Sequence, residues 1–158
     1  MKLAYLSFTE KGRQLAGRLA AALGGSVQRC GASCSLEAWT EAHFSQSDGL
    51  VYVGAAGIAV RAIAPHLKSK TTDPAVVVVD ECARYAIPIL SGHLGGANDL
   101  ARAIGRVCGA LPVLTTATDV NGVFAVDEWA KRQNCLVLNP EQIKTVSAKL
   151  LAGGTVTV

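Results

Sequence analysis

One stretch of ten residues, Ser91 to Leu100 (SGHLGGANDL), gathers most of the side chains of this chain that could carry out chemistry. His93 is the side chain there whose unperturbed pKa lies nearest neutrality, so it could take a proton from an attacking water. Because glycine has no Cβ, a carboxylate or a developing oxyanion could approach the backbone N–H groups of the glycines closely. The candidate site residues of the stretch are Ser91, Gly92, His93, Gly95, Gly96, Asn98 and Asp99.

The residues on either side predict that this stretch is a turn between a strand and a helix. Residues 85–90 (YAIPIL) are apolar and rich in strand formers, which favours a buried strand that ends at Ser91. Downstream, apolar residues recur at helical spacing until Gly109: Leu100, Ala103, Ile104, Val107 and Cys108. The first N–H groups of a helix lack internal partners and carry the positive end of its dipole, so the turn could hold an anion.

A purely structural role for the same residues stays open. The glycines could serve only the turn, and Asn98 and Asp99 could serve only to cap the helix. The stretch is neither a Walker-type phosphate loop, since it lacks GK[ST], nor the dinucleotide pattern GxGxxG.

Further polar residues follow three other predicted strands. Residues 49–53 lead into Gly57 and a short helix that is apolar nearly all round, so we expect it to be buried on most sides. Its only charge is Arg61, which either binds a carboxylate or extends into solvent. The other candidates are Asp80 and Glu81 after residues 75–79 (AVVVV), and Thr115, Thr116, Thr118 and Asp119 at the end of residues 111–115 and in the loop beyond.

Strands alternate with helices along most of the chain, which predicts an α/β fold: a three-layer α/β/α sandwich around a mostly parallel sheet. Residues 81–84 separate two apolar runs as a hairpin turn does, so the sheet is predicted to be mixed. In such sheets ligands bind beyond the carboxyl ends of the strands, and the Ser91 turn joins that edge if its strand runs parallel to the others. Further strands are predicted at 2–8, 26–29, 135–138 and 155–158, and further helices at 10–23 after a Thr9 cap, 36–45, 127–134 and 140–151.

Composition limits the class of protein. At 158 residues the chain has the length of one domain, and we expect residues 1–158 to form a single compact domain. The net charge of +3 comes from scattered lysines and arginines, which argues against nucleic acid as a partner. No apolar run reaches the ~18 residues of a membrane span and no signal segment is visible, so we expect a cytoplasmic protein away from membranes. Five cysteines without a CxxC pair suit a reducing compartment and give no metal site.

Three stretches form a more specific pattern: residues 57–65 (GIAVRAIAP), 73–81 (DPAVVVVDE) and 90–100 (LSGHLGGANDL). In this order and spacing they resemble the N-terminal part of the CbiG family of cobalt-precorrin-5A hydrolases, which act in anaerobic cobalamin (vitamin B12) biosynthesis. Residues 115–119 (TTATD) fit the family as well, and the likeness covers essentially the whole chain. Family members are usually longer, and we expect their C-terminal domain to be absent from this sequence.

The resemblance implies that a δ-lactone on a cobalt-bound tetrapyrrole is hydrolysed with loss of acetaldehyde. His93 is then the first candidate for the general base, and Asp119, Asp80 or Glu81 could orient its imidazole or act in its place. Because the cobalt belongs to the substrate, the resemblance implies no cofactor of the protein itself.

The other candidate residues would then bind the substrate. The N–H groups of Gly95 and Gly96 could stabilise the tetrahedral oxyanion, and Arg61 could pair with an acetate or propionate arm. Two other functions stay open: a non-catalytic module that binds the macrocycle or docks the C-terminal domain, and a nucleotide- or phosphate-binding α/β domain. Other pathway enzymes and further copies of the chain remain possible partners.

Overall fold

The computed structural model describes residues 1–69 and 71–156, which divide into two compact units. Unit 1 comprises Met1–Val113 and unit 2 comprises Leu114–Val158. The expectation of a single domain over residues 1–158 stays a prediction.

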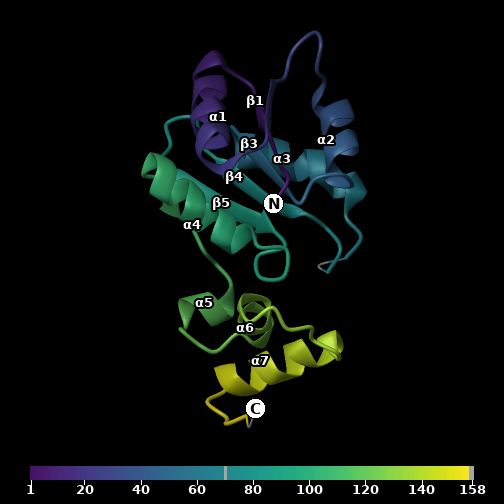
Figure 1. Cartoon of the computed structure of the whole chain (residues 1–158), viewed down its shortest axis with the longest axis vertical. Helices are drawn as coiled ribbons and strands as arrows, with labels where there is room; N and C mark the ends of the chain where they lie inside the picture. The colour runs from purple at the N-terminus through teal and green to yellow at the C-terminus, as the bar shows by residue number, and fades with distance from the viewer. Residues whose placement is uncertain (70, 157–158) are drawn as a thin grey trace. The chain divides into compact units, whose positions relative to one another are not determined.

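Unit 1 is built on a six-stranded sheet with the strand order β2-β1-β3-β4-β5-β6 (Figure 1). Its strands are β1 (Leu3–Ser7), β2 (Ser26–Arg29), β3 (Gly49–Val53), β4 (Ala75–Val79), β5 (Tyr85–Leu90) and β6 (Leu111–Pro112). The first four run parallel, β5 pairs antiparallel with β4, and β6 pairs parallel with β5. The predicted hairpin and mixed sheet are therefore confirmed.

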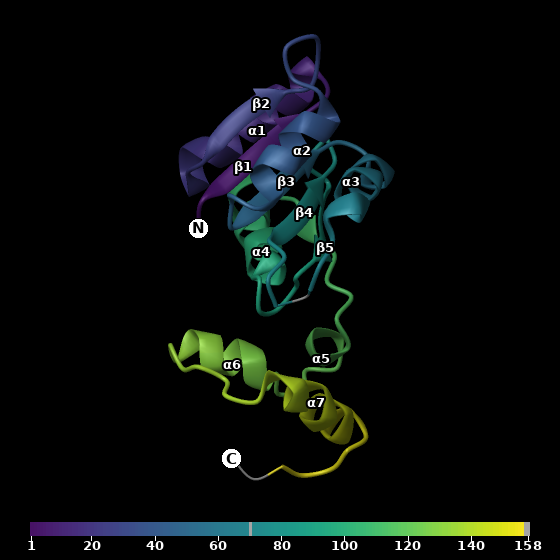
Figure 2. The same cartoon turned by 90° about the vertical axis from the view of Figure 1, so that its right-hand side faces the viewer.

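Helices cover both faces of this sheet, as Figures 1 and 2 show. On one face α1 (Glu10–Leu23) packs on β1, β2 and β3, α4 (Ala97–Cys108) packs on β4, β5 and β6, and the two helices contact each other. On the other face lie α2 (Leu36–Phe44) and α3 (Ala56–Ile63), which continues as the 3-10 turn η1 (Ala64–His66). The predicted three-layer α/β/α arrangement is confirmed.

Successive side chains of the central strands point to opposite faces of the sheet, so both faces carry apolar residues. Alternate residues of β1, β3 and β4 pack against α2 and α3 in one apolar cluster: Ala4, Leu6, Leu50, Tyr52, Val76 and Val78, with Trp39, Phe44, Ala59, Ala62 and Ile63. Within it the Tyr52 hydroxyl lies 2.9 Å from Thr40 Oγ1, and burial raises the pKa of Tyr52 to about 12. The phenol therefore stays neutral and hydrogen-bonded inside the core.

Two helices bury a different surface from the one predicted. On α4 the buried stripe is Ala97, Leu100, Ala101 and Ile104, whereas Val107 is 37% exposed. Ala97 and Ala101 are small enough to lie close to the sheet, so the helix turns that side inward. The prediction that α3 is buried on most sides is wrong: Val60 is 50% exposed, because only one side of α3 faces the sheet.

The turn between β4 and β5 is held together by the Asp80 carboxylate. Its oxygens accept hydrogen bonds from the backbone N–H of Cys82 (3.0 Å), Arg84 (2.8 Å) and Tyr85 (2.7 Å). Partial burial would raise the pKa of Asp80, but these N–H groups and the nearby Arg84 guanidinium outweigh it and lower that pKa below its usual value. Asp80 is therefore an ionised residue that stabilises the hairpin.

Unit 2 is helical: α5 (Ala117–Val120), α6 (Val126–Arg132), the 3-10 turn η2 (Pro140–Gln142) and α7 (Ile143–Leu151). The prediction of a strand at residues 135–138 is wrong, since these residues, all described, form no strand. Leu136 and Leu138 are 85% and 83% exposed there, and residues 114–156 contain no strand that could pair with this apolar run and cover it within the unit. Of the predicted final strand, residues 155–156 are not in a strand and residues 157–158 lie outside the described residues.

The corrected stripe of α4 predicts unequal costs for two truncations on the same helix. Ile104 is fully buried, so Ile104→Ala should lower the free energy of unfolding by about 2–5 kcal/mol. Val107→Ala, the matched control on the exposed side, should cost less than about 1 kcal/mol. Urea unfolding followed by circular dichroism measures both, and equal losses would contradict the observed orientation of α4.

The lowered pKa of Asp80 makes its contribution to stability dependent on pH. Because the folded pKa lies below the unfolded value of about 3.9, the contribution is complete above that value and is lost as the pH falls through the folded pKa. Asp80→Asn should therefore be less stable than the parent by about 1–2 kcal/mol at pH 7, and the difference should shrink below about pH 4.

Urea midpoints at pH 7, 5 and 3 give this difference, with Glu41→Gln on the exposed side of α2 as a control that should show none of it. A deficit of Asp80→Asn that stays constant down to pH 3 would mean that the charge of Asp80 does not stabilise the turn.

Candidate functional site

The turn after β5, which we call the His93 turn (residues 91–96), lies at the edge where the parallel strands begin. Because β5 runs antiparallel to β4, its last residue Leu90 pairs with Val76 near the start of β4. Next to that pair, Ser91 Oγ donates a hydrogen bond of 2.9 Å to the main-chain oxygen of Asp73. The His93 turn therefore does not lie at the carboxyl edge of the parallel strands, because β5 does not run parallel to them.

The backbone of the His93 turn requires glycine at two positions. A Cβ at Gly95 would lie 2.3 Å from the Cβ of Ser91, which no real contact allows. Gly96 has a φ of +87° and is the N-cap of α4, a position at which it has no side chain to accept a capping bond. The tight turn thus explains Gly95 and Gly96, and Asn98 and Asp99 lie inside the first turn of α4, after its N-cap residue.

Several N–H groups at the start of α4 are already engaged by the turn itself. Gly96 donates to the His93 carbonyl at 3.0 Å, Ala97 to Ser91 at 3.1 Å, and Asn98 to Gly92 at 3.0 Å. The expectation that Gly96 offers its N–H to an oxyanion is therefore wrong, because that donor is bonded within the turn. The role of the Gly95 N–H stays a prediction.

The polar side chains of the turn differ in their surroundings. The His93 side chain is half-buried, and Asn98 is buried with its amide against Gly92, 3.0 Å from where a Cβ would stand. Asp99 pairs with Arg102 one turn along α4 at 3.0 Å. Ser91 has a φ of +55°, an unfavourable value for a residue with a side chain. His93 thus stands, partly exposed, on a turn whose backbone is hydrogen-bonded to the start of α4.

Asp80 and Glu81 lie at the opposite edge of the sheet, where β1, β3 and β4 end. Glu81 Oε2 accepts a hydrogen bond of 2.6 Å from the Thr9 hydroxyl, which also caps α1. A crevice of about 420 Å³ opens there between Thr9, Gly54 and Arg84. The topology therefore does not bring Asp80 or Glu81 to His93, and the expectation that either could orient the imidazole is wrong.

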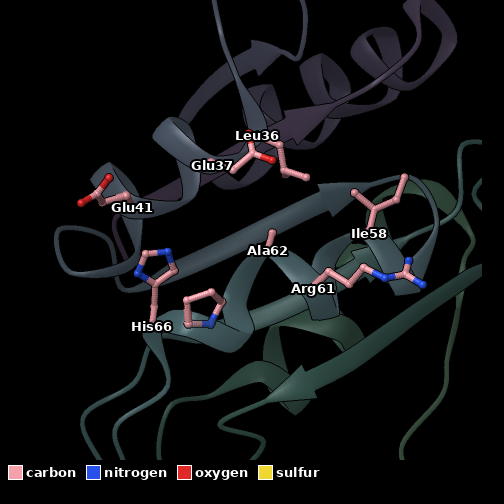
Figure 3. Close-up of a pocket in the computed structure, with 8 residues that line it drawn as sticks. Leu36, Glu37, Glu41, Ile58, Arg61, Ala62 and His66 are labelled. Atoms are coloured by element: carbon pink, nitrogen blue, oxygen red, sulfur yellow. The ribbon is translucent and has the colours of Figure 1, made fainter.

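Arg61 faces a separate groove between α2 and α3, shown in Figure 3. The groove has a volume of about 460 Å³, an apolar floor with Ile58 and Ala62, and Glu37 and Glu41 on its α2 wall. The guanidinium folds back along α3, with one Nη 3.6 Å from where a Cβ on Gly57 would stand. It makes no hydrogen bond or ion pair with any residue that the structure describes, so it remains available to an anion.

The remaining predicted residues belong to unit 2. Asp119 on α5 accepts a hydrogen bond from the Thr116 hydroxyl, Thr118 is buried and Thr115 is exposed. Their proposed roles toward the substrate stay predictions.

One residue that sequence reasoning missed is Asp73, whose carboxylate is buried beside the His93 turn. The only signal for it was its place directly before Pro74, which favours a turn in which an aspartate bonds nearby backbone groups. Among the residues that the structure describes, no group of three His, Cys, Asp or Glu side chains could hold a metal ion. None of the described helices is long and apolar enough to cross a membrane.

Comparison with known proteins gives one consistent family. The family described as Cobalamin synthesis G N-terminal (CbiG_N) matches residues 38–119, which include α3, β4, β5 and the whole His93 turn. The chain is 46% identical over 110 residues to the cobalt-precorrin-5A hydrolase of Salmonella typhimurium, covering 69% of this chain and 31% of that protein. It is 44% identical over 108 residues to the enzyme of the same name from Priestia megaterium, covering 68% of this chain and 29% of that protein.

A solved structure agrees with both matches. The chain resembles a cobalamin biosynthesis protein G homologue from Sulfolobus solfataricus with a TM-score of 0.60 and 28% identity, over 96% of this chain and 46% of that one. The matched part thus spans about a third of the length of the curated relatives. Family match, identity and fold agree on one conclusion, that the chain belongs to the cobalamin synthesis G N-terminal family.

Proposed function

We propose that the chain contributes to the hydrolysis of the lactone ring of cobalt-precorrin-5A, and that the His93 turn is its reactive site. The observation that carries the proposal is that the family match, residues 38–119, contains this turn complete. The fold supports it, because the turn holds a half-buried histidine on a hydrogen-bonded backbone at the edge of the sheet.

The chemistry assigned to His93 is general base catalysis. A water that attacks the lactone carbonyl must lose a proton, and a neutral imidazole accepts one near neutral pH. Opening the ring yields a carboxylate and frees the ring oxygen as a hydroxyl on the methylated bridging carbon. When this hydroxyl loses its proton and becomes a carbonyl, the bond from the bridging carbon to the macrocycle breaks. The macrocycle keeps the electron pair and takes up a proton, and acetaldehyde leaves. The developing oxyanion would be stabilised by the Gly95 N–H, since the Gly96 N–H is bonded to His93. No cofactor is needed beyond the cobalt of the substrate.

Arg61 is proposed to bind one acid arm of the substrate in the groove between α2 and α3. Its guanidinium has no partner among the described residues, and the apolar floor beside it suits the methylene groups of an acetate or propionate. Glu37 and Glu41 on the other wall would repel a second carboxylate, so the groove accepts a single arm that points at Arg61.

A second candidate function is binding without catalysis, as part of a longer hydrolase. The observation that favours it is that the N–H groups of Gly96, Ala97 and Asn98 are all engaged by the turn, which leaves fewer oxyanion donors there. In that case His93 would contact the macrocycle, and the reacting groups would come from other parts of a protein of the relatives' length.

Replacing His93 separates the two functions. His93→Ala and His93→Gln should lower turnover of cobalt-precorrin-5A by about 10²- to 10⁴-fold, because the attacking water loses its base. Substrate affinity should change little. Acetaldehyde release measures turnover and calorimetry measures binding. Both are measured on the protein at the length at which its organism produces it. His43→Ala is the control, since the His43 ring packs on Trp39 and its Nδ1 lies 3.3 Å from Ser47 Oγ. Unchanged turnover in both His93 variants would remove His93 from the mechanism and favour the binding function.

Arg61 is tested by binding alone. Arg61→Gln should weaken binding of the cobalt-bound tetrapyrrole by about 3- to 10-fold, the range for a partly exposed charge-assisted hydrogen bond. Arg106→Gln, an exposed arginine on α4, should leave the dissociation constant unchanged. Calorimetry at low and moderate salt gives both values, and equal affinities for parent and Arg61→Gln would exclude the groove as a carboxylate site.

A further inference from the structure

The loop before β4 is closed by a carboxylate buried inside it. Asp73 is only 8% exposed, and its side-chain oxygens accept hydrogen bonds from the backbone N–H of Lys68 (3.2 and 3.0 Å) and Ser69 (3.1 Å). Its own N–H donates to the Ser69 carbonyl at 2.9 Å. The carboxylate thus ties Lys68 and Ser69 to Asp73, because their N–H groups satisfy its buried charge.

The same residue is joined to the His93 turn through a single hydrogen bond. The main-chain oxygen of Asp73 accepts the 2.9 Å hydrogen bond from Ser91 Oγ. The Ser91 carbonyl in turn accepts the N–H of Ala97, and the His93 carbonyl accepts the N–H of Gly96. A continuous set of hydrogen bonds therefore runs from the loop through Ser91 into the backbone that carries His93.

The conformation of Ser91 indicates that its hydroxyl is used. With a φ of +55°, glycine would fit this position with less strain, yet the position holds a serine whose side chain reaches the neighbouring loop. Gly95 leaves the space that this side chain occupies, since a Cβ there would collide with it. Ser91, Gly95 and Asp73 thus form one packed arrangement.

We infer that Asp73 and Ser91 are positioning residues for His93: together they hold the His93 turn in place against the loop before β4. The structure gives neither residue a role with the reacting atoms. The inference rests on the proposed function in one respect, that His93 acts on the substrate. We call the hold of Asp73 and Ser91 on the His93 turn the bracing. It lies within unit 1 and can be measured without turnover.

Two variants remove the link in different ways. Ser91→Gly deletes the hydroxyl and relieves the backbone strain, so the fold should survive. Asp73→Asn keeps the size of the side chain but removes the charge that closes the loop. Asp48→Asn is the matched control: Asp48 precedes β3 as Asp73 precedes β4, its carboxylate accepts the Lys2 N–H at 2.6 Å, and its carbonyl accepts the Ala75 N–H.

The first measurement is nuclear magnetic resonance of the chain without substrate. Ser91→Gly and Asp73→Asn should both shift the ring proton resonances of His93 and its titration midpoint, and Ser91→Gly should also shift the amide resonances of Lys68 and Ser69. Asp48→Asn should leave the His93 resonances in place. If His93 keeps its parental resonances and titration in Ser91→Gly, the bracing is overturned, whatever the enzyme assays show.

The second measurement is turnover. In Ser91→Gly, kcat should fall by about 10- to 100-fold, as expected for a displaced catalytic group, while KM changes less than about twofold. The pH at which kcat/KM rises should move with the titration of His93. If His93→Gln is inactive but Ser91→Gly keeps the parental kcat and pH profile, positioning is overturned while the proposed function stands. If His93→Gln keeps its turnover, the proposed function fails, and the resonances of His93 alone decide the bracing.

Discussion

The antiparallel pairing of β4 with β5 is the constraint on which the arrangement of this protein depends. The four strands before it run parallel, so their following loops meet at one edge of the sheet. Because β5 runs in the opposite direction, the His93 turn that follows it lies at the edge where those strands begin. One hairpin, held by the Asp80 carboxylate, thus separates the residues that a purely parallel sheet would have brought together.

This separation gives the acidic residues of the chain different tasks. Asp80 closes the hairpin, and Glu81 bonds the Thr9 hydroxyl that caps α1, so both serve the carboxyl edge. Asp73 does the corresponding work at the other edge, where its buried carboxylate orders the loop beside His93. Each of these carboxylates is matched to hydrogen-bond donors, which is how a partly buried charge is tolerated.

Much of the fold follows from local sequence. The run AVVVV reads as a strand because β-branched side chains fit a buried sheet, and the four residues after Asp80 read as a hairpin turn; both are confirmed. The alternation of elements also predicts the three layers. The run CLVL fails as a strand because strand formation needs a neighbouring strand, which the propensity of four residues cannot supply. The buried side of α4 differs from the predicted one because Ala97 and Ala101, which the apolar pattern did not include, pack against the sheet.

The candidate site was harder to predict than the fold. The His93 turn stands out in sequence through its glycines and polar residues, but not through the bonds that use up its N–H groups, because those depend on the path of the backbone. Asp73 escaped notice for a similar reason: its partners are main-chain atoms, which leave no pattern of side chains. Arg61 was recognisable as a lone charge on an apolar helix, and the structure adds the groove beside it.

If His93 acts on the substrate, the substrate binds at the edge of the sheet that carries the His93 turn. Hydrogen–deuterium exchange of the protein, with and without saturating cobalt-precorrin-5A, locates the bound substrate. We expect slowed exchange in residues 91–98 and in the adjoining loop at residues 71–73. Protection confined to residues 8–10 and 80–84, at the opposite edge, would mean that the substrate does not bind at the His93 turn.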